Sequence, residues 1–220
     1  AWTKSKKELI SSLDGNDAFR NIGYDLIIEF MKPNLLFDQQ TTEQKQNESL
    51  DKVPRSQGVV LKNELIVDAG FLLFLSDNPH KYDNWVLTPH EGEASMLLNK
   101  SKSWVRENRI EAACLIQERY SGTVVLKGPK TIIFDGNEIY ICNHGGHYMG
   151  TAGMGDTLTG VMASIIHLIQ RSNSTNAILF AVGLHSLSAD RIQIQKGPIG
   201  ILPSDVIEKM SELVNTFYHG

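Results

Sequence analysis

The chain has 220 residues, of which 41% are hydrophobic and 21% are charged, and its formal net charge is −4. This composition is typical of a soluble globular protein, and the length is enough to bury one hydrophobic core. The acidic balance argues against a general nucleic-acid binder, which would need a basic surface to displace counterions. No apolar run approaches the roughly 20 residues of a membrane span, so we expect no membrane partner.

The first 58 residues divide into a stretch of mixed composition, 1–37, and a polar stretch, 38–58. An apolar patch at 26–31 favours a helix that ends before Pro33, because the residue before a proline avoids helical geometry. In the stretch 38–58 the apolar side chains are Leu50 and Val53 alone. Such a segment buries too little surface to offset the cost of ordering it, and a polar linker is predicted there.

The pattern sharpens from Val59 onward. Near-continuous apolar runs alternate with a helical stretch over about 104–120, which predicts a parallel sheet covered by helices on both faces. The predicted strands are 59–61, 65–67, 85–87 and 124–126.

A hairpin is predicted next, because the segments 131–134 and 138–142 flank Asp135-Gly136-Asn137 and Asp-Gly accepts the positive φ of a tight turn. Apolar residues at i, i+3, i+4 and i+7 then indicate helices. These helices are expected over about 156–171, over about 175–195, and from a cap at Ser204-Asp205 to near Phe217.

The strongest local motif is the glycine-rich segment 150–156, which reads GTAGMGD and opens the first of these helices. Its glycines let the backbone approach a ligand, and the free N–H groups of a helix start attract a phosphate. Gly153 and Gly155 are therefore candidate phosphate ligands. Asp156 is either a helix N-cap or a general base that takes a proton from an attacking hydroxyl.

A second motif, TPHEGE at 88–93, directly follows the strand 85–87, where open α/β sheets bind ligands. Glu93 is a candidate Mg²⁺ ligand through water, and His90 is a candidate donor to a polar substrate group. The alternative is an ordinary turn in which Glu91 and Glu93 favour the start of the next helix.

Two further strand ends carry polar residues. Lys127 offers a point charge for phosphates, Gly128 permits close approach and Thr131 offers a hydroxyl. The alternative interpretation of the same residues is a basic loop that binds no ligand. Asp68 ends the strand 65–67, where an acid is either structural or functional.

The remaining candidate ligands are interpreted structurally. His185 lies on an apolar helix and is interpreted as a packed core histidine. His144 and His147 lack further nearby ligands, so a metal pair is not favoured. Cys114 and Cys142 are too few for a disulfide framework and are predicted to be reduced thiols in the cytoplasm.

Together the motifs follow an order that resembles the ADP- or ATP-dependent NAD(P)H-hydrate dehydratases of the ribokinase-like superfamily. The order is VDAG, VLTPHEGEASMLL, VVLKGPKT, MGTAGMGDTLTG, AVGLHSLSADR and GILPSD, over about 59–217. The resemblance implies one ribokinase-like domain over 1–220, a three-layer α/β/α fold with a mostly parallel central sheet. Its N-terminal part is expected to be incomplete, because residues 1–58 match poorly and lack the family's glycine-rich first segment. Asp68-Ala69-Gly70 stands where the family has Asp-Ala-Asp.

The resemblance also implies an activity, which is to restore hydrated NADH and NADPH with ADP or ATP as phosphate donor and Mg²⁺ as cofactor. Asp156 would bind the substrate and deprotonate its hydroxyl, while Gly153 and Gly155 hold the phosphate. His90 and Asp68 would contact the hydrated dinucleotide, and Glu93 would be the metal-linked glutamate. The adenine nucleotide would lie against Lys127, Gly128, Pro129, Lys130 and Thr131. A homo-oligomer is expected from the same resemblance.

Two other functions stay open at this stage. A small-molecule kinase of the same superfamily would use the same phosphate site. A non-catalytic nucleotide-binding protein is suggested by the poorly matched N-terminal segment.

Overall fold

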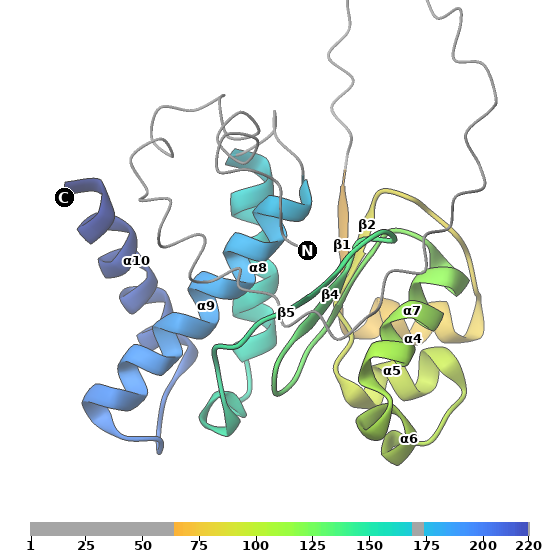
Figure 1. Ribbon diagram of the computed structural model, residues 1–220, viewed down its shortest axis with the longest axis horizontal. Coiled ribbons are helices and arrows are strands. Elements are labelled where there is room, and N and C mark those ends of the chain that lie inside the picture. The colour runs from red at the N-terminus through yellow and green to blue at the C-terminus, as the bar shows by residue number, and fades with distance from the viewer. Residues whose placement is uncertain (1–63, 169–173, 220) are drawn as a thin grey trace, which may run out of the picture.

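The computed structural model describes residues 64–168 and 174–219 (Figure 1). The predicted helix at 26–31, the linker 38–58 and the strand 59–61 lie outside the described residues. The remaining predictions can be compared with the structure.

Five strands form one sheet in the order β1-β2-β3-β4-β5. The β1–β2 and β2–β3 pairs are parallel, and the β3–β4 and β4–β5 pairs are antiparallel. Four strands therefore run in one direction and β4 runs against them, which confirms a mostly parallel sheet. The strands are β1 (Leu65–Val67), β2 (Trp85–Leu87), β3 (Thr123–Leu126), β4 (Ile132–Phe134) and β5 (Ile139–Ile141).

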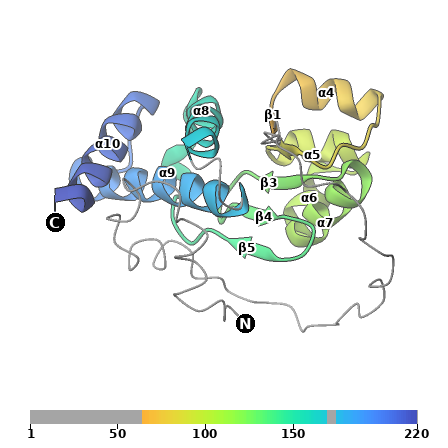
Figure 2. The same cartoon turned by 90° about the horizontal axis from the view of Figure 1, so that it is seen from above.

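Helices cover both faces of this sheet, so the fold has the expected three layers (Figures 1 and 2). One face carries α4 (Gly70–Asp77), α5 (Glu91–Leu98), α6 (Lys102–Glu107) and α7 (Arg109–Tyr120). The other carries α8 (Met154–Leu168), α9 (Ser174–Lys196) and α10 (Pro203–His219), with α9 packed between α8 and α10.

The strands divide their side chains between two hydrophobic cores. Val86 and Val125 pack into the core with α8, α9 and α10, whereas their neighbours Leu87, Val124 and Leu126 pack into the core with α4, α5 and α7. This division follows from the period of two along a strand. It explains why the strands are apolar at nearly every position.

The predicted hairpin is confirmed as β4–β5. Asp135 Oδ1 accepts hydrogen bonds from the backbone N–H groups of Asn137 at 2.9 Å and Glu138 at 2.8 Å. Gly136 has a φ of 95°, a conformation that side chains with a Cβ rarely adopt. The turn therefore depends on both letters of the Asp-Gly pair.

Some helix boundaries differ from the sequence predictions. The single helix expected over about 104–120 is wrong, because Asn108 divides it into α6 and α7. The backbone N–H and the side-chain amide of Asn108 both donate to the Trp104 carbonyl at 2.9 Å, and its φ of −125° breaks the helix. This local competition for a backbone acceptor is usual for asparagine.

The last helix begins at Pro203, ahead of the predicted cap, and proline suits the first helical position. Asp205 does not precede the helix but reaches back from its first turn, where Oδ2 accepts from the Leu202 N–H at 3.0 Å. The expected cap at Ser204-Asp205 is therefore displaced to Leu202, with Asp205 supplying the side-chain hydrogen bond.

Two broader expectations also have an outcome in the structure. Cys114 and Cys142 are both free and form no disulfide with each other, and their reduced state stays a prediction. Within 64–168 and 174–219, none of the helices has the length and apolar character needed to cross a membrane.

Candidate functional site

The glycine-rich segment ends at the start of α8, as the phosphate-site prediction requires. Gly153 has a φ of 86°, and its carbonyl accepts from the Thr157 N–H at 2.9 Å, which makes it the residue that precedes the helix. Asp156 therefore lies in the first turn, and the N-cap interpretation is wrong. Its side chain is exposed, and no hydrogen bond engages it within the described residues. The carboxylate is free to meet a ligand.

A cleft of about 230 Å³ opens beside this helix start. Its walls are the loop after β3, the glycine-rich segment before α8, and the first turns of α8 and the middle of α9. Among the predicted nucleotide-binding residues, five line this cleft and two do not. Lys127, Gly128, Pro129, Thr131 and Gly155 line it, whereas Gly153 and the exposed Lys130 lie outside its lining.

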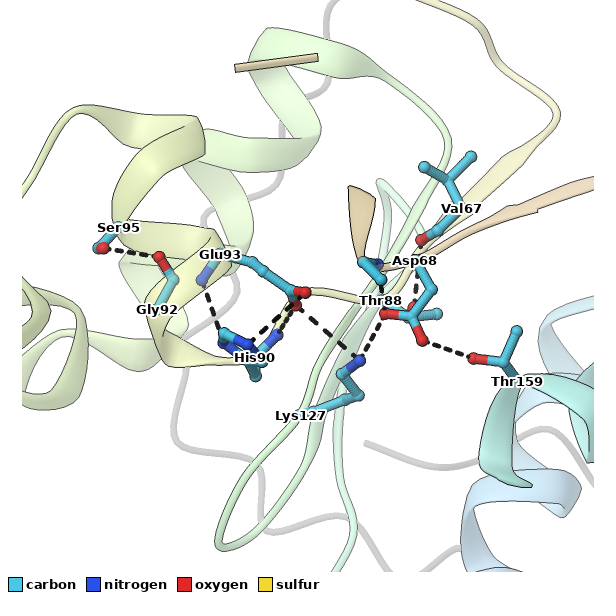
Figure 3. Close-up of polar contacts among 10 residues, drawn as sticks. Val67, Asp68, Thr88, His90, Gly92, Glu93, Ser95, Lys127 and Thr159 are labelled. Atoms are coloured by element: carbon cyan, nitrogen blue, oxygen red, sulfur yellow. Dashed lines mark hydrogen bonds and ion pairs between the residues drawn. The ribbon is translucent and has the colours of Figure 1, made fainter. Parts of the chain in front are cut away.

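Lys127 connects two other predicted site residues, Asp68 and Glu93 (Figure 3). Its Nζ lies 2.6 Å from Asp68 Oδ1 and 3.9 Å from Glu93 Oε2. Asp68 Oδ2 accepts from the Thr159 hydroxyl at 2.9 Å, so α8 joins the same network. The structure thus brings together the ends of β1 and β3 and the starts of α5 and α8, as expected for strand ends that share one edge of a sheet.

The network keeps Asp68 ionised despite its partial burial. Desolvation alone raises the pKa of Asp68, but the hydrogen bond and charge of Lys127 and the Thr159 hydroxyl outweigh it and hold the pKa below its ordinary value. The carboxylates of Asp68 and Glu93 therefore hold the Lys127 ammonium in place, and Lys127 lines the cleft as a fixed cation.

Lys127 also lies close to the start of α8. A Cβ placed on Gly155 would lie 3.4 Å from Lys127 Nζ. An ammonium group and the free N–H groups of a helix start are thus adjacent, and both favour an anion. This convergence is the strongest feature of the site.

Glu93 and His90 form a reciprocal cap on α5. The His90 N–H donates to Glu93 Oε2 at 2.8 Å, and the Glu93 N–H donates to His90 Nδ1 at 3.1 Å. This capping box satisfies two backbone donors of the helix start, so the expectation that Glu93 favours a helix start is confirmed. The His90 side chain is 59% exposed, and its other nitrogen, Nε2, lies 3.6 Å from Glu93 Oε1.

The described residues contain no group of three or more His, Cys, Asp or Glu side chains that could hold a metal ion. Glu93 already accepts one hydrogen bond and faces the Lys127 ammonium, so its carboxylate is partly neutralised. The protein alone therefore supplies an incomplete ligand set for Mg²⁺.

A second polar cluster at the cleft was missed by the sequence analysis. Asp190 on α9 accepts from His144 Nδ1 at 2.8 Å, from the Gly145 N–H at 2.9 Å and from the Tyr148 hydroxyl. Burial raises the pKa of Asp190, but these hydrogen bonds outweigh it and hold the pKa below its usual value. The cluster links the loop 144–148, part of which lines the cleft, to α9.

The separation of 46 residues between His144 and Asp190 hid this cluster, because nothing local links them. One signal was available in the sequence. An aspartate on a helix as apolar as 175–192 has to find hydrogen-bond partners when it is buried.

His185 is also placed at the cleft. It is 3% exposed, in agreement with the prediction of a packed histidine, yet it lines the cleft together with Ser186. Burial lowers the pKa of His185 to about 4, so the ring is neutral at physiological pH.

Comparisons with known protein families give a match over most of the chain. The family profile described as NAD(P)H-hydrate dehydratase matches residues 42–212. A second profile, described as 7TM-HD extracellular, matches residues 3–73, most of which lie outside the described residues.

Relatives with related names occur in several bacteria. The bifunctional NAD(P)H-hydrate repair enzyme Nnr of Coxiella burnetii is 38% identical over 159 residues, which cover 71% of this chain and 32% of the relative. That of Vibrio cholerae is 37% identical over 183 residues, which cover 83% of this chain and 35% of the relative. The chain thus spans about a third of the length of these relatives.

Solved structures agree with the fold. The ADP/ATP-dependent NAD(P)H-hydrate dehydratase from Bacillus subtilis, co-crystallized with ATP/Mg²⁺ and soaked with CoA, is 25% identical with a TM-score of 0.64 over 72% of this chain and 58% of that chain. A ribokinase-like superfamily protein from Enterococcus faecalis is 26% identical with a TM-score of 0.61 over 70% of this chain and 53% of that chain. The fold is ribokinase-like, and the chain belongs to the NAD(P)H-hydrate dehydratase family.

Proposed function

We propose that this chain restores hydrated NADH and NADPH, with ADP or ATP as the phosphate donor. The observation that carries the proposal is the free carboxylate of Asp156, one residue from Gly155, which lies against Lys127. An acid without a partner beside an anion-binding helix start is suited to proton transfer next to a phosphate. The family and the names of the relatives supply the substrate.

The nucleotide occupies the cleft, with its terminal phosphate between the Gly155 N–H and the Lys127 ammonium. Thr131 and Gly128 line the same wall, where the backbone can approach the rest of the nucleotide. The negative charge that develops during transfer is stabilised by groups already in place. Asp68 orients Lys127 and so acts on the phosphate through it.

The reaction follows from this placement in two steps. Asp156 removes the proton of the substrate hydroxyl as its oxygen bonds to the terminal phosphorus, and the bond from phosphorus to the nucleotide breaks, releasing AMP from ADP or ADP from ATP. The C6–O bond of the phosphorylated ring then breaks with help from the ring nitrogen. Phosphate leaves with the electron pair, and loss of a proton from C5 restores the reduced nicotinamide. Hydroxide is a poor leaving group, so the phosphate is what makes elimination possible.

The substrate side of the site is assigned to His90 and Asp68. His90 is exposed near the end of β2 and is not among the residues that line the nucleotide cleft. Its Nε2, which lies 3.6 Å from Glu93 Oε1, can also meet a polar group of the dinucleotide.

Mg²⁺ enters this scheme together with the nucleotide. The related structure from Bacillus subtilis was co-crystallized with ATP/Mg²⁺. Because the described residues lack a ligand set of their own, most of the ligands of Mg²⁺ would have to come from phosphate and water, which this ion prefers. Glu93 contributes through water at most. When bound, Mg²⁺ neutralises charge on the transferring phosphate.

The proposal is tested by incubating the whole chain with hydrated NADH and either ADP or ATP. Recovery of the absorbance of the reduced nicotinamide is expected with at least one nucleotide. Asp156→Asn should abolish this recovery while nucleotide affinity stays within about twofold, because the general base contributes roughly 10² to 10⁴ in rate and not to binding. A variant as active as the parent removes Asp156 from the mechanism.

Two other outcomes of the same assay favour other functions. Phosphate transfer to an alcohol without recovery of NADH indicates a small-molecule kinase of the same fold. Tight nucleotide binding without any turnover indicates a non-catalytic relative. Organisation as one domain over 1–220, a cytoplasmic location and a homo-oligomeric state stay predictions of the resemblance.

A further inference from the structure

His185 is a residue of the cleft with an unused hydrogen-bonding atom. Its side chain lies on α9, is 3% exposed and lines the cleft together with Ser186, Lys127 and Gly128. Within the described residues, Nε2 is fully buried and has no hydrogen-bond partner. Buried polar atoms of this kind are rare in proteins, because each one costs free energy that a partner would recover.

The state of the ring decides which partner Nε2 can take. A hydrogen bond to the backbone of Met154 raises the pKa of His185, so it stabilises the protonated form and the ring must be its donor. Because Nε2 has no partner, this donor is Nδ1. Burial keeps the ring neutral at physiological pH, with a pKa of about 4. A neutral ring that carries its proton on Nδ1 leaves Nε2 as an acceptor.

An acceptor selects among the groups of a nucleotide. Phosphate oxygens are acceptors themselves, so Nε2 does not bind them, and Lys127 already serves that end of the cleft. The uncharged donors of a nucleoside are the hydroxyl groups of the ribose and the amino group of the adenine base. Lys127 and the N–H groups beside Gly155 suit the phosphates, whereas His185 Nε2 suits an uncharged donor of the nucleoside.

We propose that His185 Nε2 accepts a hydrogen bond from the nucleoside part of the bound adenine nucleotide, from a ribose hydroxyl or from the 6-amino group. This inference rests on the proposed nucleotide site and adds a selecting residue to it. His185 acts by recognition of the nucleotide and takes no part in the proton or phosphate transfer.

The opposing explanation is that His185 is a filler of the core. If packing were its only role, an apolar side chain of similar size would be more favourable at this position, because the imidazole leaves a polar atom buried without a partner. His185→Leu removes the unpartnered Nε2 together with the hydrogen bond to Met154. These two effects oppose each other, so its melting temperature without nucleotide should stay close to that of the parent. This expectation separates a role in binding from a role in packing.

The test measures the affinity of the whole chain for ADP, 2′-deoxy-ADP, 3′-deoxy-ADP and inosine diphosphate by titration calorimetry. The parent should lose about tenfold in affinity for the one analogue that lacks the donor bonded to Nε2, and bind the other two like ADP. His185→Leu should bind ADP about tenfold more weakly than the parent and no longer distinguish that analogue. The analogue that loses affinity identifies whether the donor is a ribose hydroxyl or the amine.

Two further variants keep the result interpretable. His185→Gln carries an amide oxygen that can reach the position of Nε2, and it should recover part of the discrimination. Ser188→Ala, one turn along α9, removes a buried hydroxyl that is already bonded to the Leu184 carbonyl at 2.8 Å, and it should bind all four nucleotides like the parent.

Equal losses in the parent and in His185→Leu across all the analogues would overturn the role of His185 and leave the proposed function intact. A parent that binds all four nucleotides equally would do the same. A parent that binds none of them would overturn the proposed function and this inference together.

Discussion

Lys127 and Asp68 form an ion pair that joins the ends of β3 and β1, with 2.6 Å between Nζ and Oδ1. Both side chains are largely buried, at 16% and 13% exposed. Neither charge can return to water without a rearrangement of the strand ends. The pair therefore fixes the cation that the cleft offers to a phosphate.

Replacing Asp68 by Asn should lower both stability and nucleotide affinity. The amide cannot neutralise Lys127, which keeps only Glu93 at 3.9 Å as an opposite charge. We expect a loss of about 2 kcal/mol in the free energy of unfolding, the size of a hydrogen bond to a charged group, measured by urea denaturation. Glu91→Gln is the matched control, because the Glu91–Arg106 pair is exposed and should contribute nothing measurable. Equal effects of the two variants would contradict this account.

The first turn of α8 can be blocked without harm to the helix. In Gly155→Ala the new methyl group would lie 3.4 Å from Lys127 Nζ, in the space that a phosphate would use. We expect nucleotide affinity to fall at least tenfold while the melting temperature is unchanged or higher, since alanine suits a helix better than glycine.

Gly160→Ala on the same helix is the control for that experiment. Nothing lies within 4 Å of the added Cβ, so stability should rise by about 0.5–1 kcal/mol with no change in affinity. Comparable affinity losses in both variants would place the phosphate away from Gly155.

The loop 144–148 should become more mobile when Asp190 is replaced by Asn. The charge of Asp190 holds His144, the Gly145 N–H and the Tyr148 hydroxyl at once, so its loss should speed hydrogen exchange at the amides of 145–150. Asp205→Asn should leave that exchange unchanged, because Asp205 bonds to Leu202 at the start of α10. Unaltered exchange in Asp190→Asn would show that the loop is held by other contacts.

Stability should fall as the pH drops from about 6.5 to about 4. Over this range the unfolded chain protonates His185, whereas the folded chain does not, because burial lowers its pKa to about 4. Protons then favour the unfolded state. The loss is on the order of 3 kcal/mol at the lower end, measured by urea denaturation at several pH values. His185→Leu should lack most of this slope, and an unchanged slope would assign the effect to other groups.

Much of the fold was predictable because its signals are local. The strands at 65–67 and 85–87 were read from apolar runs, and the β4–β5 hairpin from Asp135-Gly136. The eight-residue helix α4 was not predicted, since its sequence, GFLLFLSD, is apolar without a helical period. The break at Asn108 was missed because it depends on one side chain competing for a backbone carbonyl.

The candidate site, like the fold, was predictable where its signals are local in the sequence. The motifs that would touch the nucleotide could be found one by one, since each lies at a strand end or a helix start. The Asp190 cluster joins segments far apart in the chain and became visible only in three dimensions. The interpretation of His185 as a core residue was correct about its burial and left out the cleft beside it.

The division of strand side chains between two cores has a consequence for the chemistry. Asp68, Thr88 and Lys127 each directly follow the last residue of a strand. A slip of one position in any strand would turn its apolar residues toward the wrong layer of helices, and would carry the polar residue behind it more than 3 Å along the strand. The positions of the residues at the proposed phosphate site therefore depend on hydrophobic packing, and conservative changes deep in the sheet would shift them without altering a single polar group.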